Sequence, residues 1–389
     1  MVARSRAAEL RPPLDSGPMR YRRMPIEVES PEQYGYDRID CNLAESSLSD
    51  LRLGDLVAPE ELADLVLAYG DHLGHPGLRA IVAADGKGLD PDDVLVTPGA
   101  AGALFFLHTS ILEAGDHLVV VRPNYATNLE TPRTLGAVVS HLDLRIEDGW
   151  RIDPDAVAAL TTSRTRLVSI TTPHNPTGVV LSAEALAAIV EHVERIGARL
   201  IVDETYRDLA FDGPTPLAAS LGERTISVSS ASKAYGLPGV RVGWLVTRDR
   251  ALRDLVLAAK EQIVITGSAV DEELAFRALD RRDTWLPAAL ERARAARAIV
   301  GSWIESDPRF EWIEPSGGTV AFPRIRTDSR ADLPRFHSLL LDRYATAVGP
   351  GHWFEQDDRF FRIGFGWPTP DRLERGLANV SAALSDAGG

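Results

Sequence analysis

The stretch Ser229-Ser230-Ala231-Ser232-Lys233-Ala234-Tyr235-Gly236-Leu237-Pro238-Gly239-Val240-Arg241-Val242-Gly243 places one lysine among hydroxyl and glycine residues, eight positions before an arginine. Lys233 is one of only three lysines in a chain whose lysines and arginines number 42. Lysine, unlike arginine, gives up its proton readily enough to condense with an aldehyde into a Schiff base. This stretch is therefore suited to an aldehyde cofactor that carries a phosphate, and pyridoxal 5′-phosphate (PLP) is the candidate.

Apolar runs on both sides of this stretch predict a sheet. Between Pro59 and Val270 short apolar runs alternate with helical segments such as Ser182 to Ile196, as expected for strands and crossover helices. The expected strands are Val94 to Thr97, His117 to Val121, Val138 to Leu142, Leu167 to Thr171, Leu200 to Asp203, Thr225 to Val228 and Val240 to Thr247. Leu200-Ile201-Val202 is apolar throughout, which indicates a sheet covered on both faces. We expect an α/β fold, a three-layer sandwich around a mostly parallel seven-stranded sheet.

A second, smaller unit is expected near the C-terminus. At 389 residues the chain is long for one compact domain. The segment Leu286 to Ile304 is a strong helix candidate that bridges two domains. It is followed by the expected helix Leu333 to Tyr344, the strand Phe360 to Phe365 and the helix Asp371 to Leu384. We expect a mobile tail over 1–20, a large PLP-binding domain over 59–285 and a small α+β domain over 286–389.

The composition argues against several classes of protein. A net charge of −14 opposes binding to nucleic acid, and the sequence shows no basic patch that would offset it. No apolar run approaches the about 20 residues that span a membrane. Cys41 is the only cysteine, so no intrachain disulfide forms, and the cytoplasm is the expected location. No set of metal ligands is predicted.

Asp203 and Tyr206 follow the apolar strand that ends at Val202, where α/β sheets place their ligands. A carboxylate at this edge keeps the pyridine nitrogen of PLP protonated, which makes the ring an electron sink. Helix N-capping is the alternative role for Asp203. Tyr206 is expected to reach the phenolic oxygen of the cofactor, and a place in the core is its alternative role.

Further loops supply a phosphate site and a contact to the phenolic oxygen. Asn175, in the turn after the strand that ends at Thr171, is expected to donate to that oxygen. The run Val96 to Leu104 leads from a strand through small residues into a helix, so the backbone amides of Gly99, Ala100 and Ala101 can hold a phosphate. Ser230 and Arg241 complete this phosphate site through a hydroxyl and a bidentate guanidinium contact.

Two more residues are expected to contact the cofactor and the substrate. Tyr125 lies just after a strand end, where it can stack on the cofactor ring; a core aromatic is the alternative. Arg362 interrupts the apolar strand Phe360 to Phe365, and a buried arginine requires an anion. The α-carboxylate of an amino-acid substrate is the expected anion, with an internal Asp or Glu as the alternative.

This combination of motifs resembles the aspartate aminotransferase superfamily, the fold-type I PLP enzymes, in its class I and II aminotransferase branch. The likeness spans roughly residues 42–384, and its motifs stand in the order and spacing of the family. They are Tyr69 with Gly74 and Leu78-Arg79, Gly99, Tyr125, Asn175 to Gly178, Asp203 with Tyr206, Ser230 with Lys233 and Arg241, Gly317-Gly318, and Arg362.

The resemblance implies a homodimer with shared active sites, in which Tyr69 reaches the phosphate bound by the partner chain. It also implies that residues 21–58 join the small domain and that Arg362 and Asn175 bind the amino-acid substrate. Where many relatives have a Gly-Glu-Pro turn near the substrate, this chain has Ala44-Glu45-Ser46. Ala44 and Glu45 are therefore expected to contact the substrate and to change how it packs.

The expected reaction begins when an L-amino acid displaces Lys233 as an external aldimine and loses its Cα proton to give a quinonoid. Aminotransfer, with a place in specialised metabolism, is the expected outcome. The alternative is β- or γ-elimination followed by addition or cyclisation, because Ser232 to Gly239 and Gly317 to Arg324 are similar to a PLP-dependent cyclase of this branch. A non-catalytic effector-binding protein is a remote alternative, disfavoured because the sequence has no helix-turn-helix pattern.

Overall fold

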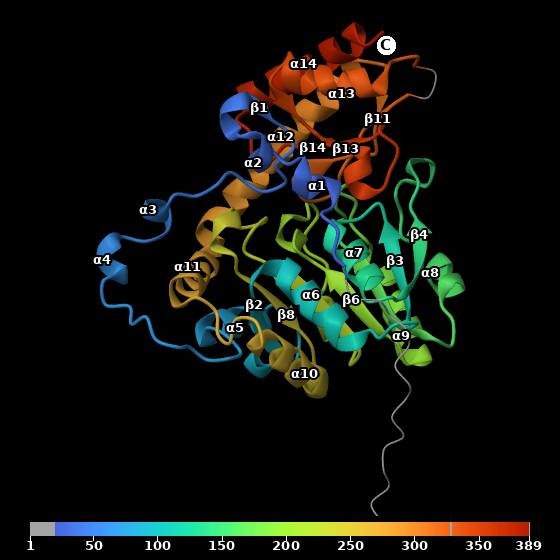
Figure 1. Ribbon diagram of the computed structural model, residues 1–389. Helices are drawn as coiled ribbons and strands as arrows, with labels where there is room; N and C mark the ends of the chain where they lie inside the picture. Colours follow the sequence, from blue (N-terminus) through green and yellow to red (C-terminus); the bar gives the residue numbers. More distant parts are fainter. Residues whose placement is uncertain (1–19, 327–328, 389) are drawn as a thin grey trace, which may run out of the picture.

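The computed structural model describes residues 20–326 and 329–388, and nearly all of the predicted tail over 1–20 lies outside the described residues. Figure 1 shows a larger part built around a sheet and a smaller part above it, with helix α12 (Arg282–Ser306) running between them. This is the predicted α/β fold with a large and a small domain. In the described residues, no helix is both long enough and apolar enough to cross a membrane.

The large domain is built on one seven-stranded sheet in the order β2-β8-β7-β6-β5-β3-β4. The strands are β2 (Val94–Thr97), β3 (His117–Arg122), β4 (Val138–Asp143), β5 (Thr165–Thr171), β6 (Arg199–Asp203), β7 (Thr225–Ser230) and β8 (Gly243–Val246). All neighbours run parallel except β8, which is antiparallel to both β2 and β7. The mostly parallel seven-stranded sheet predicted from the apolar runs is confirmed.

Helices cover both faces of this sheet, which explains why its strands are apolar on both sides. The helices of the large domain are α5 (Pro76–Ala84), α6 (Gly99–Ile111), α7 (Ala126–Thr134), α8 (Pro154–Leu160), α9 (Ala183–Ile196), α10 (Arg250–Glu261) and α11 (Ala269–Asp280). Successive residues of β6 show the two faces, since Ile201 packs with α6 and α10 while Leu200 and Val202 pack with α8 and α9. The three-layer arrangement follows from this alternation.

One strand boundary differs from the sequence-based expectation. The predicted strand from Val240 begins only at Gly243, because Pro238–Val240 forms a turn of 3-10 helix, η6. Arg241 then adopts a left-handed conformation with φ of 56°. An apolar run does not reveal such a backbone reversal, which needs positive φ at a non-glycine residue. The reversal turns the Arg241 side chain toward the N-terminus of α6.

The small domain combines a segment from the first fifty residues with the C-terminal part of the described chain. Its C-terminal part contains α12, β9 (Phe310–Glu311), β10 (Val320–Ala321), β11 (Arg324–Ile325), α13 (Leu333–Asp342), β12 (Thr346–Ala347), β13 (Gly349–Pro350), β14 (Phe361–Gly364) and α14 (Pro370–Asp386). Strand β1 (Cys41–Asn42) pairs in parallel with β12. This pairing attaches the N-terminal segment to the small domain, while the exact domain boundaries stay predictions.

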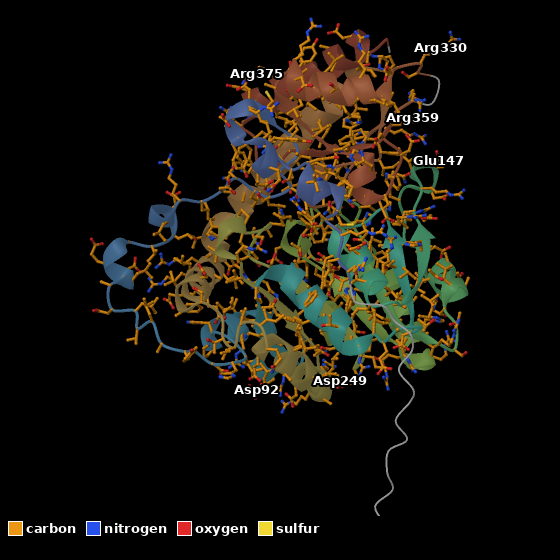
Figure 2. All side chains as sticks on the ribbon, in the orientation of Figure 1. Asp92, Glu147, Asp249, Arg330, Arg359 and Arg375 are labelled. Carbon is orange, nitrogen blue, oxygen red and sulfur yellow. The ribbon has the colours of Figure 1, made fainter. Side chains whose placement is uncertain are left out.

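Two charged contacts join the domains at their facing edges. Glu147, labelled at the upper edge of the large domain in Figure 2, lies 2.7 Å from Arg324 of β11. Glu355, which follows η7 (Gly351–Phe354), pairs with Arg133 of α7. These pairs hold the edges of the two domains together on the side of β4.

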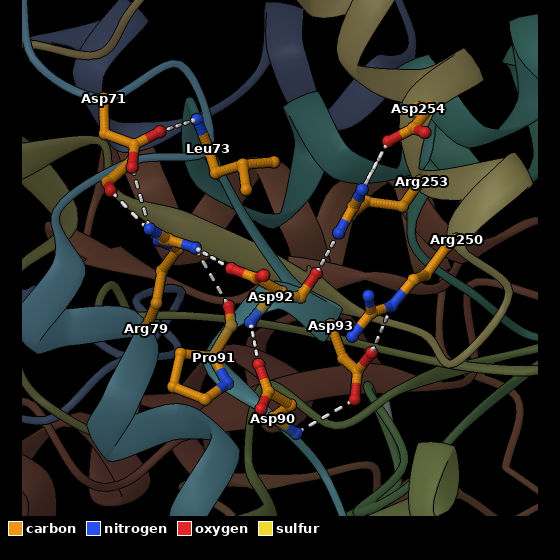
Figure 3. A network of polar contacts seen from close by, with 11 residues as sticks. Asp71, Leu73, Arg79, Asp90, Pro91, Asp92, Asp93, Arg250, Arg253 and Asp254 are labelled. Atoms are coloured by element: carbon orange, nitrogen blue, oxygen red, sulfur yellow. Dashed lines mark hydrogen bonds and ion pairs between the residues drawn. The ribbon is translucent and has the colours of Figure 1, made fainter.

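An arm of residues 50–75 stands off the body on the left of Figure 1 and carries only the short helices α3 (Leu53–Leu56) and α4 (Pro59–Leu62). The arm is fixed where it returns to the large domain. Figure 3 shows Arg79 of α5 donating to Asp71, 2.8 Å away, and to the carbonyl oxygen of Pro91, 3.1 Å away. Because Arg79 is almost fully buried, this contact anchors the base of the arm.

Candidate active site

A cavity of about 470 Å³ lies at the carboxyl ends of β5, β6 and β7, between the two domains. Small-molecule sites of this type range from about 300 to 1,000 Å³. Twelve of the residues singled out in the sequence line it: Ala44, Glu45, Ala100, Ala101, Tyr125, Asn175, Asp203, Tyr206, Ser230, Lys233, Arg241 and Arg362. Residues distant in sequence thus meet in one pocket, with the N-terminal segment forming its outer wall.

The amine of Lys233 reaches the pocket from the loop that follows β7. Its Nζ lies 3.4 Å from Oε1 of Glu45. Burial alone lowers the pKa of the lysine, but Glu45 and Tyr206 raise the pKa above its ordinary value. For Glu45 the directions are reversed. Burial raises its pKa, but Lys233, the Ser46 amide and Arg362 together hold that pKa below its ordinary value. The pair therefore consists of an ammonium and a carboxylate.

Asp203 ends β6, and its carboxylate lacks a cationic partner in the described residues. Its Oδ1 accepts hydrogen bonds from the amide of Thr205 at 3.1 Å and from the hydroxyl of Thr205 at 2.6 Å. Burial raises its pKa, although these hydrogen bonds oppose the rise. A protonated pyridine nitrogen would pair with this buried carboxylate.

The N-terminus of α6 and the guanidinium of Arg241 form a cradle for an anion. No side chain caps the first amides of α6, so they are free to bind a phosphate. A Cβ on Gly99 would lie 2.6 Å from Nη2 of Arg241, and a Cβ on Gly243 would lie 2.4 Å from the backbone of Gly99. Only glycine lets the helix, the strand and the guanidinium approach this closely.

The charge of this cradle is uncompensated. In the part of the chain that the structure describes, Arg241 donates only to the hydroxyl of Ser232 at 3.4 Å and to the carbonyl oxygen of Pro238 at 3.0 Å. Ser230, which is buried, also lines the pocket. A guanidinium beside an uncapped helix N-terminus fits a dianionic phosphate.

Arg362 reaches the pocket from β14 of the small domain. It is 4% exposed, and burial lowers its pKa. Nη1 donates to Oδ1 of Asn175 at 3.0 Å, and Nη2 donates to the carbonyl oxygen of Ala44 at 2.7 Å. Its Nε has no hydrogen-bond partner within the described residues. None of these contacts is with an Asp or Glu, which was the alternative anion for Arg362. The positive charge of Arg362 is therefore available for a carboxylate ligand.

The two tyrosines of the pocket differ in their contacts. Tyr125 is half-buried at the start of α7, and its amide donates to the side chain of the fully buried Asn124 at 2.7 Å. The hydroxyl of Tyr206 donates to the carbonyl oxygen of Ser46 at 2.9 Å. Tyr206 thus contacts the Ala44–Ser46 segment in this structure, and its role toward a phenolic oxygen stays a prediction.

A buried histidine connects the loops that carry Tyr125 and Asn175. The ring of His174 contacts the carbonyl oxygen of Pro123 at 3.0 Å and the hydroxyl of Thr177 at 2.8 Å. Burial lowers its pKa to about 4, so the ring is neutral. His174 therefore positions two pocket loops without adding charge.

Two predicted residues do not line the pocket. Gly99 lies behind it, against Arg241. Tyr69 is 81% exposed on the arm and does not line the pocket of its own chain. Sequence reasoning missed several lining residues, among them Glu27, Glu32, Ser232, Thr205 and Trp353. Ser232 and Thr205 had a signal, because they neighbour Lys233 and Asp203, whereas the others come from distant segments.

The pocket satisfies the separate requirements of a PLP site on structural grounds. A lysine amine, a buried carboxylate without a cation and a cationic cradle with no internal anion are brought together. Among the described residues, no group of three His, Cys, Asp or Glu side chains is placed to hold a metal ion. The residues present fit a phosphorylated pyridine aldehyde.

Comparison with known proteins agrees with this geometry. The family model described as aminotransferase class I and II matches residues 56–380. Capreomycidine synthase of Streptomyces vinaceus is 33% identical over 380 residues, 96% of each chain. Arginine–pyruvate transaminase of Pseudomonas aeruginosa is 31% identical over 294 residues, 74% of each chain. The solved structure of the PLP-dependent cyclase OrfR superposes with a TM-score of 0.84 at 29% identity, over 97% of this chain and 100% of that chain.

Proposed function

The chain belongs to the class I and II aminotransferase family, and we propose that it converts an L-amino acid with a cationic side chain by elimination and ring closure. Pyridoxal 5′-phosphate is the cofactor. When bound, PLP supplies a covalent attachment point and an electron sink for the charge left on Cα. Lys233 holds the cofactor, Asp203 faces its ring nitrogen, and Arg241 with the N-terminus of α6 binds its phosphate.

Arg362 is the proposed carboxylate-binding residue of the substrate. Nη1 donates to the side chain of Asn175 and Nη2 donates to the carbonyl oxygen of Ala44. These two hydrogen bonds fix the plane of the guanidinium. A bidentate contact to the α-carboxylate then sets the Cα–H bond in reach of Lys233. Released from the cofactor, the Lys233 amine takes the Cα proton.

The acidic outer wall of the pocket carries the proposal of a cationic side chain. Three carboxylates, Glu27, Glu32 and Glu45, line the pocket from the N-terminal segment. Glu45 pairs with Lys233, and Oε2 of Glu27 accepts a hydrogen bond from the amide of Met24 at 2.9 Å. Glu32 and the second oxygen of Glu27 are left to face the side chain of a bound amino acid. Burial lowers the pKa of Arg362, and Glu32 is close enough to oppose part of that fall. Two carboxylates favour an ammonium or guanidinium group in this position, and one relative carries arginine in its name.

The choice of elimination and ring closure is supported by the extent of similarity. The match to capreomycidine synthase leaves about 4% of either chain uncovered, so it includes the N-terminal segment that forms the outer wall. The match to OrfR is equally complete. In this reaction a leaving group departs from the side chain and a side-chain nitrogen adds in its place, so the net change is loss of the leaving group and one proton. A place in specialised metabolism is part of the proposal.

Transamination is the second candidate. It is favoured by the similarity to the arginine–pyruvate transaminase, which is 31% identical and matches 74% of each chain. The two reactions share proton removal by Lys233 and differ only afterwards. A transaminase requires a keto acid as a second substrate, whereas an eliminating cyclase does not.

A homodimer with shared active sites is part of the proposal. The arm exposes Val66, Leu67 and Tyr69 to 76%, 75% and 81%. Apolar side chains this exposed on a projecting segment are buried most simply against a second copy of the chain. Tyr69 is proposed to contact the phosphate site of that copy, and the cytoplasm remains the proposed location.

Three amino acids of equal length test the proposal with purified, PLP-loaded protein. Arginine and β-hydroxyarginine carry a guanidinium, whereas citrulline replaces it with a neutral urea. We expect arginine to exchange its Cα proton in D₂O, β-hydroxyarginine to lose water without any keto acid, and citrulline to do neither. Keto-acid formation with conversion of the cofactor to its amine form would support transamination instead. Equal processing of citrulline would refute the cationic side chain.

A further inference from the structure

The ion pair between Glu45 and Lys233 joins residues 188 positions apart in the chain. It is the only salt bridge that Lys233 forms within the described residues. The carboxylate approaches the nitrogen that the proposed function assigns to cofactor attachment and proton transfer. Glu45 therefore acts on the reacting atom itself, which the two outer carboxylates Glu27 and Glu32 do not contact.

The carboxylate of Glu45 is fixed before any ligand binds. Its Oε1 accepts hydrogen bonds from the amides of Ser46 at 2.8 Å and Ser47 at 3.1 Å. Its backbone is packed so tightly against β14 that a Cβ on Gly364 would lie 1.6 Å from the Glu45 carbonyl oxygen. Since backbone amides and packing hold the group, Glu45 itself loses little side-chain entropy when it pairs with Lys233.

Glu45 also lies between two positive charges. The preceding residue, Ala44, accepts a hydrogen bond from Arg362, and Arg362 lowers the pKa of Lys233 while Glu45 raises it. An opposite charge within about 4–6 Å typically moves a pKa by 1–3. Without Glu45 the lysine would have to gain a proton in a buried site where no other carboxylate of the described residues forms a salt bridge with it, which is electrostatically unfavourable.

We infer that Glu45 is a second catalytic residue, whose carboxylate is the counterion that stabilises the protonated nitrogen of Lys233. In the proton transfer, the Cα–H bond breaks, the proton forms a bond to Nζ, and the electron pair stays on the substrate. The neutral amine becomes an ammonium 3.4 Å from a fixed carboxylate. With the cofactor bound, the same carboxylate would hold a proton on Nζ in the Lys233–cofactor linkage. This inference rests on the proposed function.

The first test is a pH titration of the visible absorption band of the Lys233-bound cofactor, without substrate. We expect Glu45→Gln to lower the pKa of that linkage by at least about 1 and Glu45→Asp to restore part of it. The control is Glu147→Gln, which removes an ion pair with Arg324 outside the pocket. An unchanged pKa in Glu45→Gln, with an unaltered melting temperature, would overturn the inference.

The second test follows exchange of the substrate Cα proton in D₂O by NMR, which reports proton transfer without product formation. We expect Glu45→Gln to slow exchange by about tenfold or more, within the range of a positioned acid–base group. Exchange at the wild-type rate would also overturn the inference. Borohydride reduction of the wild type tests the proposed function independently of Glu45. A pyridoxyl tag at Lys233 would support that function whatever the effect of the Glu45 variants. Absence of that tag would refute the proposed function itself.

Discussion

The inner and outer halves of the pocket are built in different ways. The inner half consists of residues at strand ends and at one long helix, such as Asp203 at the end of β6 and Gly99 at the start of α6. The outer half consists of α1 (Pro25–Val28) and α2 (Pro31–Tyr34), two four-residue helices that expose Glu27 and Glu32. One half is fixed by the central sheet, whereas the other depends on a short segment laid against the small domain.

We expect the inner half of the pocket to carry out the catalysis and the outer half to determine which substrate binds. Sheet edges cannot shift without breaking the core, so they hold the groups that need accurate geometry. Short helices on the surface tolerate substitution and can be changed to suit different side chains. We therefore expect substitutions in the inner half to reduce kcat strongly, and substitutions in the outer half to change substrate preference at nearly constant kcat.

The largest effect is expected at Lys233. Lys233→Ala removes both the proposed attachment point and the proposed proton acceptor, so turnover should fall by at least about 10⁴-fold. Stopped assays with mass-spectrometric detection of product would measure this loss. Lys87→Ala is the matched control, because Lys87 is exposed and distant from the pocket. Comparable losses in both variants would show that Lys233 has no special role.

Asp203→Asn should produce the next largest effect. The amide keeps the shape of the side chain but removes the negative charge that we propose to face the cofactor nitrogen, and we expect exchange of the Cα proton to slow by roughly 10²–10³-fold. The rate is measured by NMR in D₂O at saturating substrate. Thr205→Val is a useful companion, because it removes the 2.6 Å hydrogen bond to Asp203 without touching the charge. A loss at Thr205 as large as that at Asp203 would argue that orientation, not charge, matters.

The same contrast explains how much could be predicted from the sequence. Asp203 was identifiable because it ends an apolar run, and strand ends in an α/β sheet converge on one edge. Lys233 was identifiable because it is one of only three lysines and lies among hydroxyl and glycine residues. The pairing of Glu45 with Lys233 had no such signal, since it depends on how the N-terminal segment packs on β14. Arg241 was predicted as a phosphate ligand, but its left-handed backbone was not, because propensity gives no reason for positive φ at an arginine.

In the outer half, Glu32→Gln should raise KM for a cationic amino acid by about tenfold, equivalent to about 1.4 kcal/mol, at similar kcat. The neutral analogue of equal length should be unaffected or bound slightly better. Steady-state kinetics with both compounds measure the difference, and the Glu27→Gln/Glu32→Gln double variant should enlarge it. A fall in kcat with unchanged KM would show that Glu32 takes part in catalysis. It would contradict the division between a catalytic inner half and a substrate-selecting outer half.

The smallest effect concerns what holds the outer half in place. Nε2 of His352, in η7, lies 2.6 Å from Glu29, which ends α1, and Nδ1 lies 2.8 Å from Asp358. The indole of Trp353 also donates to Glu29, at 2.8 Å. This cluster links the N-terminal segment to the small domain and brings Trp353 to the pocket wall.

The hydrogen bond to Asp358 and the contact with Glu29 raise the pKa of His352 from 6.5 to about 9, despite partial burial. A raised folded-state pKa means that its stabilisation is complete below pH 6.5 and is lost as pH rises through about 9. Because the imidazole is 40% exposed, solvent screening reduces the contribution to the order of 1 kcal/mol. Denaturant unfolding between these pH values should therefore show a steeper loss of stability in the wild type than in His352→Asn. Parallel curves would mean that the protonated ring does not hold α1, and that the acidic wall is positioned by its remaining contacts, led by the indole of Trp353 on Glu29.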